Sequence, residues 1–275
     1  MALRQPIFLD PTTIDDRLGP RYARHPGPYS IQYGGRTMKD KGLFDIFPGM
    51  EEIPYNPDEF PLPEYGDMNG TEREVLVRIL QWLQPRTLLE YGTNKGRSTA
   101  IMTAKSPENA RILTVDLPDD QRGEFANPDY STDTAFMSGE VGVYYKGTAY
   151  ERKITQVRMD ARSNAFERVL DKWLGEEKID FALVDAAHDY KTTRQLFKQA
   201  EARLRHGGVI LTDDYGAKAA THIGTIQALA ELGREGFPLY WFNPRYQRPE
   251  AVEPLYKRPE YKDFSAVLFV NVPRT

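Results

Sequence analysis

The first sustained pattern of apolar and polar positions begins at Thr71. In the segment "TEREVLVRILQWL", apolar residues recur at the spacing of one helical face, at Val75, Leu76, Ile79, Leu80 and Leu83. This spacing predicts an amphipathic helix over residues 71–83. Thr71 and Glu74 have the spacing of a capping box, so we expect the helix to begin at Thr71.

Beyond this helix, short apolar runs alternate with amphipathic segments. The apolar runs predict strands at 87–92, 111–118, 153–161, 179–186 and 207–215, and the segments between them predict helices at 96–106, 163–174 and 190–204. Such alternation predicts a doubly wound α/β domain, in which helices cover both faces of a mostly parallel sheet.

The C-terminal part continues this pattern less regularly. It predicts a helix near 219–233 and two further strands at 238–243 and 264–272. These strands bring the expected sheet to seven, and the last of them is expected to pair antiparallel at an edge.

Two regions lack a sustained period. Residues 1–68 are rich in Pro, Gly and Tyr, and we expect an ordered arm that packs on the core, over a site, or on a second copy of the chain in a homo-oligomer. A partly disordered leader is the alternative, although disordered segments are usually poor in aromatic residues. The insert 118–152 is too long for a simple connection and is expected to act as a lid or binding loop. The chain therefore divides into an arm (1–68) and a domain (69–275).

Composition narrows the classes of function. The chain has 275 residues, a net charge of −4 and no cysteine. The absence of cysteine excludes disulfides, thiolate metal sites and cysteine nucleophiles. No basic excess points to a nucleic-acid partner. We find neither a signal peptide nor a run of about 20 apolar residues that would span a membrane. A cytoplasmic protein with no membrane partner is expected.

In doubly wound sheets, ligands bind beyond the carboxyl ends of the strands. In this chain, each of the five predicted parallel strands ends in acidic or polar residues. The five groups are Glu90 to Gly96, Asp116, Asp160, Asp185 to His188, and Asp213 with Asp214. Carboxylates placed only for solubility would be found at both edges of the sheet, so this edge is the expected site.

The turn after the first of these strands is suited to a nucleoside. In "LLEYGTNKGRST", Gly92 and Gly96 permit a tight turn and close approach of the backbone to a ligand. The spacing differs from the G-x-G-x-x-G of dinucleotide sites. Asp116 is placed to accept hydrogen bonds from a ribose diol, with a helix cap or a surface charge as the alternative. Asp160 is placed to bind an adenine amino group or to cap the helix beginning near Ser163.

The segments "LLEYGTNKG", "TVDLP", "VDAAHDY" and "LRHGGVILTDDYG" resemble class I S-adenosylmethionine-dependent methyltransferases over residues 71–243. Within that class the chain looks most like the metal-dependent natural-product sugar (macrolide glycoside) O-methyltransferases. Family members usually have Gly where this chain has Asn94, which narrows the room over the cofactor. The resemblance implies a Rossmann-like methyltransferase fold and S-adenosylmethionine as cofactor. The cofactor-binding residues that it implies are Glu90, Gly92, Thr93, Asn94, Gly96, Ser98, Asp116, Asp160, Ala161 and Asp185.

Asp185, Asp213 and Asp214 follow two strands that we expect to be neighbours. Three carboxylates at close range repel one another unless a cation offsets their charge, and Mg²⁺ suits a site of few carboxylates with waters. The resemblance agrees, because metal-dependent members of the class place acids at these strand ends. The alternatives are that Asp213 or Asp214 caps a helix and that Asp185 pairs with Arg194 or Lys191.

His188 is the candidate general base. Methyl transfer to a hydroxyl requires loss of the hydroxyl proton, and imidazole accepts protons near neutral pH. Asp189 is expected to orient His188 or to act as the base itself. A His188 that only caps the following helix is the alternative. We therefore expect a Mg²⁺-dependent O-methyltransferase acting on a small hydroxylated molecule such as a sugar. A metal-independent N- or carboxyl-methyltransferase and a non-catalytic nucleoside-binding protein are the competing hypotheses.

Overall fold

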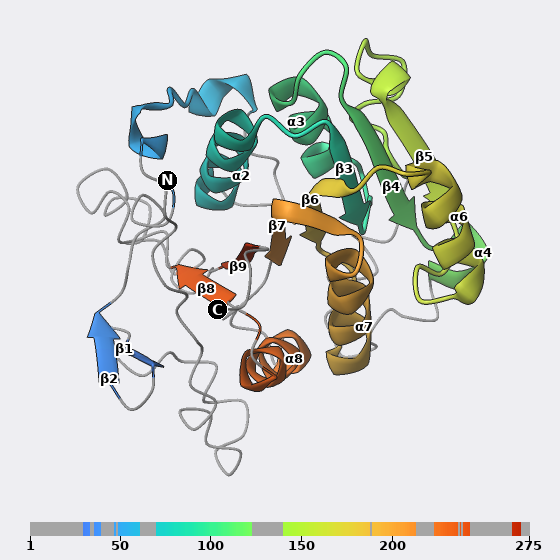
Figure 1. Ribbon diagram of the computed structural model, residues 1–275. Helices are drawn as coiled ribbons and strands as arrows, with labels where there is room; N and C mark the ends of the chain where they lie inside the picture. The colour runs from blue at the N-terminus through green and yellow to red at the C-terminus, as the bar shows by residue number, and fades with distance from the viewer. Residues whose placement is uncertain are drawn as a thin grey trace.

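The structure is a computed structural model, shown in Figure 1. It describes residues 30–33, 36–39, 47, 49–60, 70–122, 140–187, 189–212, 223–235, 237, 239–242 and 266–270. Within these ranges no helix is long and apolar enough to cross a membrane.

The centre of the molecule is a sheet with the strand order β5-β4-β3-β6-β7-β9-β8. Five strands pair in parallel: β5 (Ile154–Arg158), β4 (Arg111–Asp116), β3 (Thr87–Tyr91), β6 (Ile179–Val184) and β7 (Leu204–Thr212). All five residues of β3 are buried, as expected for a strand covered on both faces. The predicted parallel α/β fold is confirmed.

Helices cover both faces of the sheet. Figure 1 shows α2 (Gly70–Leu83) and α3 (Arg97–Lys105) on one side, and α6 (Asn164–Leu174), α7 (Tyr190–Glu201) and α8 (Ile223–Arg234) on the other. The amphipathic α6 turns Phe166, Leu170 and Leu174 into the core. Shorter elements are α4 (Asp119–Arg122), the 3-10 turns η3 (Met50–Glu52), η4 (Pro57–Glu59) and η5 (Glu151–Lys153), and the antiparallel pair β1 (Ser30–Tyr33) and β2 (Arg36–Lys39).

The structure corrects two details. The last strand, β9 (Ala266–Val270), does pair antiparallel, but it lies between β7 and β8 (Leu239–Phe242) rather than at the edge. Helix α2 begins at Gly70, one residue before the predicted start at Thr71. The Glu74 carboxylate accepts a hydrogen bond from Arg78 Nε at 2.8 Å, one helical turn further on.

Part of the predicted arm packs on α2. Arg78 is almost fully buried and donates to the carbonyl oxygens of Met50 (3.0 Å) and Ile53. Phe47 is buried against Trp82, with 5.0 Å between ring centroids. The charged side chain of Arg78 thus joins α2 to the carbonyls of this segment, and its guanidinium finds hydrogen-bond acceptors where it is buried.

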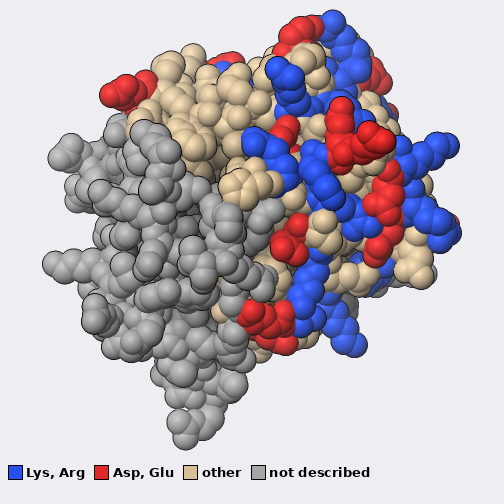
Figure 2. All heavy atoms as spheres, viewed as in Figure 1, with Lys and Arg blue, Asp and Glu red and all other residues tan. Residues whose placement is uncertain are grey.

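Charges of both signs are mixed on the surface over α6 and α7 (Figure 2). Several form ion pairs between neighbouring elements, such as Arg194 of α7 with Glu235 and Arg203, just after α7, with Asp171 of α6. On the face shown, basic side chains are interspersed with acidic ones over these helices.

Candidate functional site

The loop between β3 and α3 has left-handed backbone at three positions. Gly92, Asn94 and Gly96 have φ values of 96°, 46° and 82°. Asn94 therefore keeps the conformation that glycine adopts most easily, and asparagine is among the few other residues that tolerate it. The Asp116 carboxylate accepts hydrogen bonds from the backbone N–H of Asn94 at 2.6 Å and of Leu117 at 2.7 Å. Asp116 thus holds the turn of the loop at the carboxyl end of β4.

Gly92 is required by a neighbouring strand. A Cβ atom at Gly92 would lie 1.8 Å from the carbonyl oxygen of Asp185. The Asp185 N–H also donates to the Tyr91 carbonyl at 3.0 Å. Gly92 therefore permits a close contact with the backbone of Asp185, which joins the loop to the end of β6. The predicted close approach to a ligand stays a prediction.

Glu90 lies fully buried beneath the loop. Its carboxylate accepts hydrogen bonds from the hydroxyls of Ser98 and Thr99 in α3 and of Thr114 in β4. Burial raises the pKa of Glu90 to about 7, against the lowering effect of these hydrogen bonds. Thr93 joins the same group, 2.6 Å from the Thr114 hydroxyl. Glu90, Ser98 and Thr93 therefore tie the loop to the sheet, and their contacts with a cofactor stay predictions.

The last part of the predicted insert packs along α3. The N–H groups of Gly142 and Tyr144 donate to the carbonyls of Asn94 (2.9 Å) and Lys95 (3.0 Å). Further on, Lys153 Nζ donates to the carbonyls of Thr103 and Pro107 at the other end of the helix. The predicted lid role of residues 123–139 lies outside the described residues.

Tyr145 anchors this segment to the loop. Its ring fills a notch between two glycines, since a Cβ at Gly96 would lie 2.5 Å from Tyr145 Cε1 and one at Gly142 would lie 2.4 Å from the phenol oxygen. The side chain is buried, and burial raises the pKa of its phenol. The sequence did not reveal this role of Tyr145, because nothing local shows which glycines will accept its ring.

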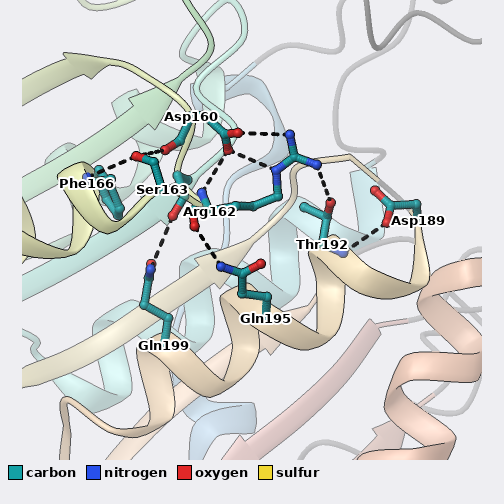
Figure 3. A network of polar contacts seen from close by, with 9 residues as sticks. Asp160, Arg162, Ser163, Phe166, Asp189, Thr192, Gln195 and Gln199 are labelled. Atoms are coloured by element: carbon teal, nitrogen blue, oxygen red, sulfur yellow. Dashed lines mark hydrogen bonds and ion pairs between the residues drawn. The ribbon is translucent and has the colours of Figure 1, made fainter.

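A second turn, residues 160–163, follows β5. Arg162 makes three hydrogen bonds to the Asp160 carboxylate: Nε at 2.9 Å, Nη2 at 2.9 Å and the backbone N–H at 2.8 Å (Figure 3). These bonds lower the pKa of Asp160. Ser163 caps α6 by accepting the N–H of Phe166, so the alternative that Asp160 is the cap is wrong. Sequence reasoning missed Arg162, whose pairing spans only two residues.

The segment after β6 carries the predicted chemistry. Asp189 caps α7, because its Oδ1 accepts the N–H of Thr192 at 3.0 Å. The alternative that His188 is the cap is therefore wrong. His188, Asp213 and Asp214 lie outside the described residues. Arg194, suggested as a partner for Asp185, pairs with Glu231 and Glu235 of α8.

The sheet register bears on the predicted metal site. Strands β6 and β7 are parallel neighbours, and Val184 pairs with Thr212. In sequence, Val184 is followed by Asp185 and Thr212 by Asp213. Among the residues that the structure describes, no group of three or more histidines and carboxylates is close enough to hold a metal ion. Asp213 and Asp214 are not among those residues.

The Gly92 contact predicts a large effect of adding one methyl group. Gly92→Ala is expected to lower the free energy of unfolding by roughly 3 kcal/mol or more, because Cβ would overlap the Asp185 carbonyl. Gly147→Ala is the matched control, with φ of 71° and no atom within 4 Å of its Cβ. Urea unfolding measures both. Equal losses in the two variants would show that left-handed strain, and not the contact, sets the cost.

The raised pKa of Glu90 predicts a pH-dependent stability. An unfolded glutamate ionises near pH 4.5, whereas the folded carboxyl holds its proton until about pH 7. Its contribution is therefore fully present below pH 4.5 and is lost as pH rises to 7, by on the order of 3 kcal/mol. Glu90→Gln is expected to gain that amount relative to wild type between pH 4.5 and 7 in unfolding experiments. Parallel stability curves would contradict the buried, neutral carboxyl.

A comparison with protein families also finds a methyltransferase domain, the class that the sequence resembles. Residues 89–215 match the family model described as a methyltransferase domain. This range begins within β3 and contains the loop between β3 and α3, together with Asp116, Asp160 and Asp185. A comparison with curated proteins finds no match.

Three solved structures illustrate what the chain is similar to. One is the O-methyltransferase TomG from Streptomyces achromogenes, involved in tomaymycin synthesis and in complex with SAM. It is 19% identical to this chain, the match covers 78% of this chain and 85% of TomG, and the TM-score is 0.49. Cofactor-bound Rv0187 from MTB has 16% identity, coverages of 79% and 87%, and a TM-score of 0.48. The O-methyltransferase from Bacillus cereus in complex with SAH has 17% identity, coverages of 83% and 94%, and a TM-score of 0.43.

The family match, together with the parallel sheet and the loop after β3, confirms the class that the sequence resembled. Residues 89–215 are a methyltransferase domain.

Proposed function

We propose that the protein is an O-methyltransferase that transfers the methyl group of S-adenosylmethionine to a hydroxyl of a small molecule, with Mg²⁺ at the acceptor site. A sugar of a natural product is the acceptor class that the sequence resemblance favours. The observation that carries the proposal is the β6–β7 register, in which paired residues are followed by Asp185 and Asp213.

The cofactor is assigned to the crevice above β5, β4 and β3. Asp116 is assigned to the ribose diol, because its carboxylate lies at the end of β4 and holds the loop through the N–H of Asn94. Asp160 and Ala161 are assigned to the adenine end and residues 92–96 to the methionine end. The left-handed backbone of the loop supports this assignment by holding the loop in one conformation.

The acceptor is assigned to the ends of β6 and β7. Carboxylates of Asp185, Asp213 and Asp214 form the oxygen-rich donor set that Mg²⁺ prefers. When bound, the ion would lower the pKa of an acceptor hydroxyl and hold it in line with the methyl group. His188 is proposed to take the hydroxyl proton while the oxygen attacks the methyl carbon and the carbon–sulfur bond breaks. Asp189, which caps α7, is proposed to fix the segment that carries His188.

A calorimetric titration tests the cofactor and the metal separately. S-adenosylhomocysteine should bind the purified protein with and without EDTA, and methyl transfer, found by screening glycosides and catechols, should stop with EDTA and return with Mg²⁺. Asp213→Ala should lose transfer and its Mg²⁺ dependence while keeping cofactor affinity. The control Asp171→Ala removes a surface carboxylate of α6 that pairs with Arg203. Transfer that is insensitive to EDTA would contradict the metal role.

Two histidine variants test the role of His188 as general base. His188→Ala is expected to reduce turnover by about 10²–10⁴-fold at unchanged cofactor affinity, because the acceptor proton loses its carrier. The control is His206→Ala, which changes an exposed histidine in β7. Steady-state rates with saturating cofactor measure both variants. Wild-type turnover in His188→Ala would reject the assignment of the base.

A further inference from the structure

The turn at residues 160–163, called here the Asp160 turn, is attached to α7 as well as to its own helix. Gln195 Nε2 donates to the carbonyl of Arg162 at 2.8 Å, and Gln199 Nε2 donates to the carbonyl of Ala161 at 3.2 Å. Figure 3 shows both glutamines reaching from α7 toward the turn. The backbone of the Asp160 turn is therefore fixed by the helix that follows the predicted catalytic segment.

Arg162 extends this attachment to the first turn of α7. While Nε and Nη2 hold the Asp160 carboxylate, Nη1 donates to the Thr192 hydroxyl at 3.4 Å. The backbone N–H of the same Thr192 donates a hydrogen bond to Asp189, the cap residue of α7. The negative charge of Asp189 is also one cause of the raised pKa of Arg162. One guanidinium thus lies between the carboxylates of Asp160 and Asp189.

This contact joins two ends of the crevice that the sheet keeps apart. Strands β5 and β6 are separated by β4 and β3 in the strand order. The Asp160 turn follows β5, where the adenine end of the cofactor is assigned, and Asp189 follows β6, where the chemistry is assigned. Helices α6 and α7 lie on the same face of the sheet, and the turn before α6 lies beside Gln195 and Gln199 of α7 (Figures 1 and 3). From there the Arg162 side chain reaches Thr192 in the first turn of α7.

We propose that Arg162 is a positioning residue that couples occupation of the adenine end of the cofactor site to the placement of the first turn of α7 and of the segment 185–189 before it. The proposal rests on the assignment of the cofactor ends given above. An adenine amino group that donates to Asp160 competes with Arg162 for carboxylate oxygens. The guanidinium is then drawn more strongly to Thr192 and Asp189. The 3.4 Å contact to Thr192 is long for a hydrogen bond and can shorten.

The coupling requires the several N–H donors that a planar guanidinium presents in fixed directions. Arginine binds a carboxylate through two nitrogens and still presents a third to another partner, whereas lysine offers a single point charge. Arg162→Met keeps much of the length of the side chain and removes every polar contact of its guanidinium. Arg203→Met is the matched control. Arg203 makes the same two-nitrogen pair with Asp171, at 2.6 and 3.0 Å, between α6 and the residues after α7.

Hydrogen–deuterium exchange of the full chain measures the coupling without an acceptor. Saturating S-adenosylhomocysteine is expected to slow amide exchange at residues 192–196 by about fivefold or more in wild type, the lower range of measured couplings. Arg203→Met should keep that effect. Arg162→Met should still bind S-adenosylhomocysteine by calorimetry but slow exchange there by less than about twofold. Arg162→Lys should behave like Arg162→Met.

Each other outcome overturns the proposal in a recognisable way. Slowing of wild-type size in Arg162→Met would reject the coupling. Loss of S-adenosylhomocysteine binding in a folded Arg162→Met would make Arg162 a direct cofactor ligand and not a positioning residue. Failure of wild type itself to bind would reject the cofactor assignment and the coupling with it. If Arg162→Met does not fold, Thr192→Val removes one buried hydroxyl from the same contact and is expected to weaken the slowing; an unchanged effect would reject the coupling.

Discussion

The site depends on the contact between Gly92 and the backbone of Asp185. Strand β3 lies between β4 and β6, and the chain leaves β3 through a residue whose hydrogen atom faces the Asp185 carbonyl. No side chain fits there, so the cofactor loop and the segment carrying Asp185 are held at one distance. The same contact therefore connects the part of the site assigned to the methyl donor with the part assigned to the acceptor. A methyl transfer reaction needs this kind of fixed separation, because the donor carbon and the acceptor oxygen must be in line.

Two carboxylates then fix the shape of the loop from different sides. The buried Glu90 carboxylate accepts hydrogen bonds from three hydroxyls, and the Asp116 carboxylate, at the end of β4, accepts one from the Asn94 N–H. Burying Glu90 without partners would be costly, and the hydroxyls of Ser98, Thr99 and Thr114 offset that cost. Asn94 occupies a left-handed position, and its N–H is bound by Asp116, so an asparagine keeps here a conformation that glycine adopts most easily.

Much of this arrangement could be predicted from periodicity. The alternating apolar runs predicted every parallel strand and the helices α3, α6 and α7, because burial on both faces of a sheet leaves a strong local pattern. The loop residues and Asp116 were predicted from their position after strands. What could not be predicted depends on packing between distant segments. The Tyr145 notch joins residue 145 to Gly96, and the anchoring of α7 joins Gln195 to Arg162. Helix α2 begins one residue before its predicted start, because a matching pair of side chains does not fix where a helix begins. His188, Asp213 and Asp214 keep their predicted roles as proposals.

The most direct measurement is a crystal structure of the protein with S-adenosylhomocysteine. The account predicts the ribose hydroxyls on Asp116, the adenine beside Asp160 and Ala161, and the homocysteine end against residues 92–96. The sulfur should face the ends of β6 and β7. A complex in which the ribose makes no contact with Asp116, or in which the sulfur faces away from Asp185, would contradict it.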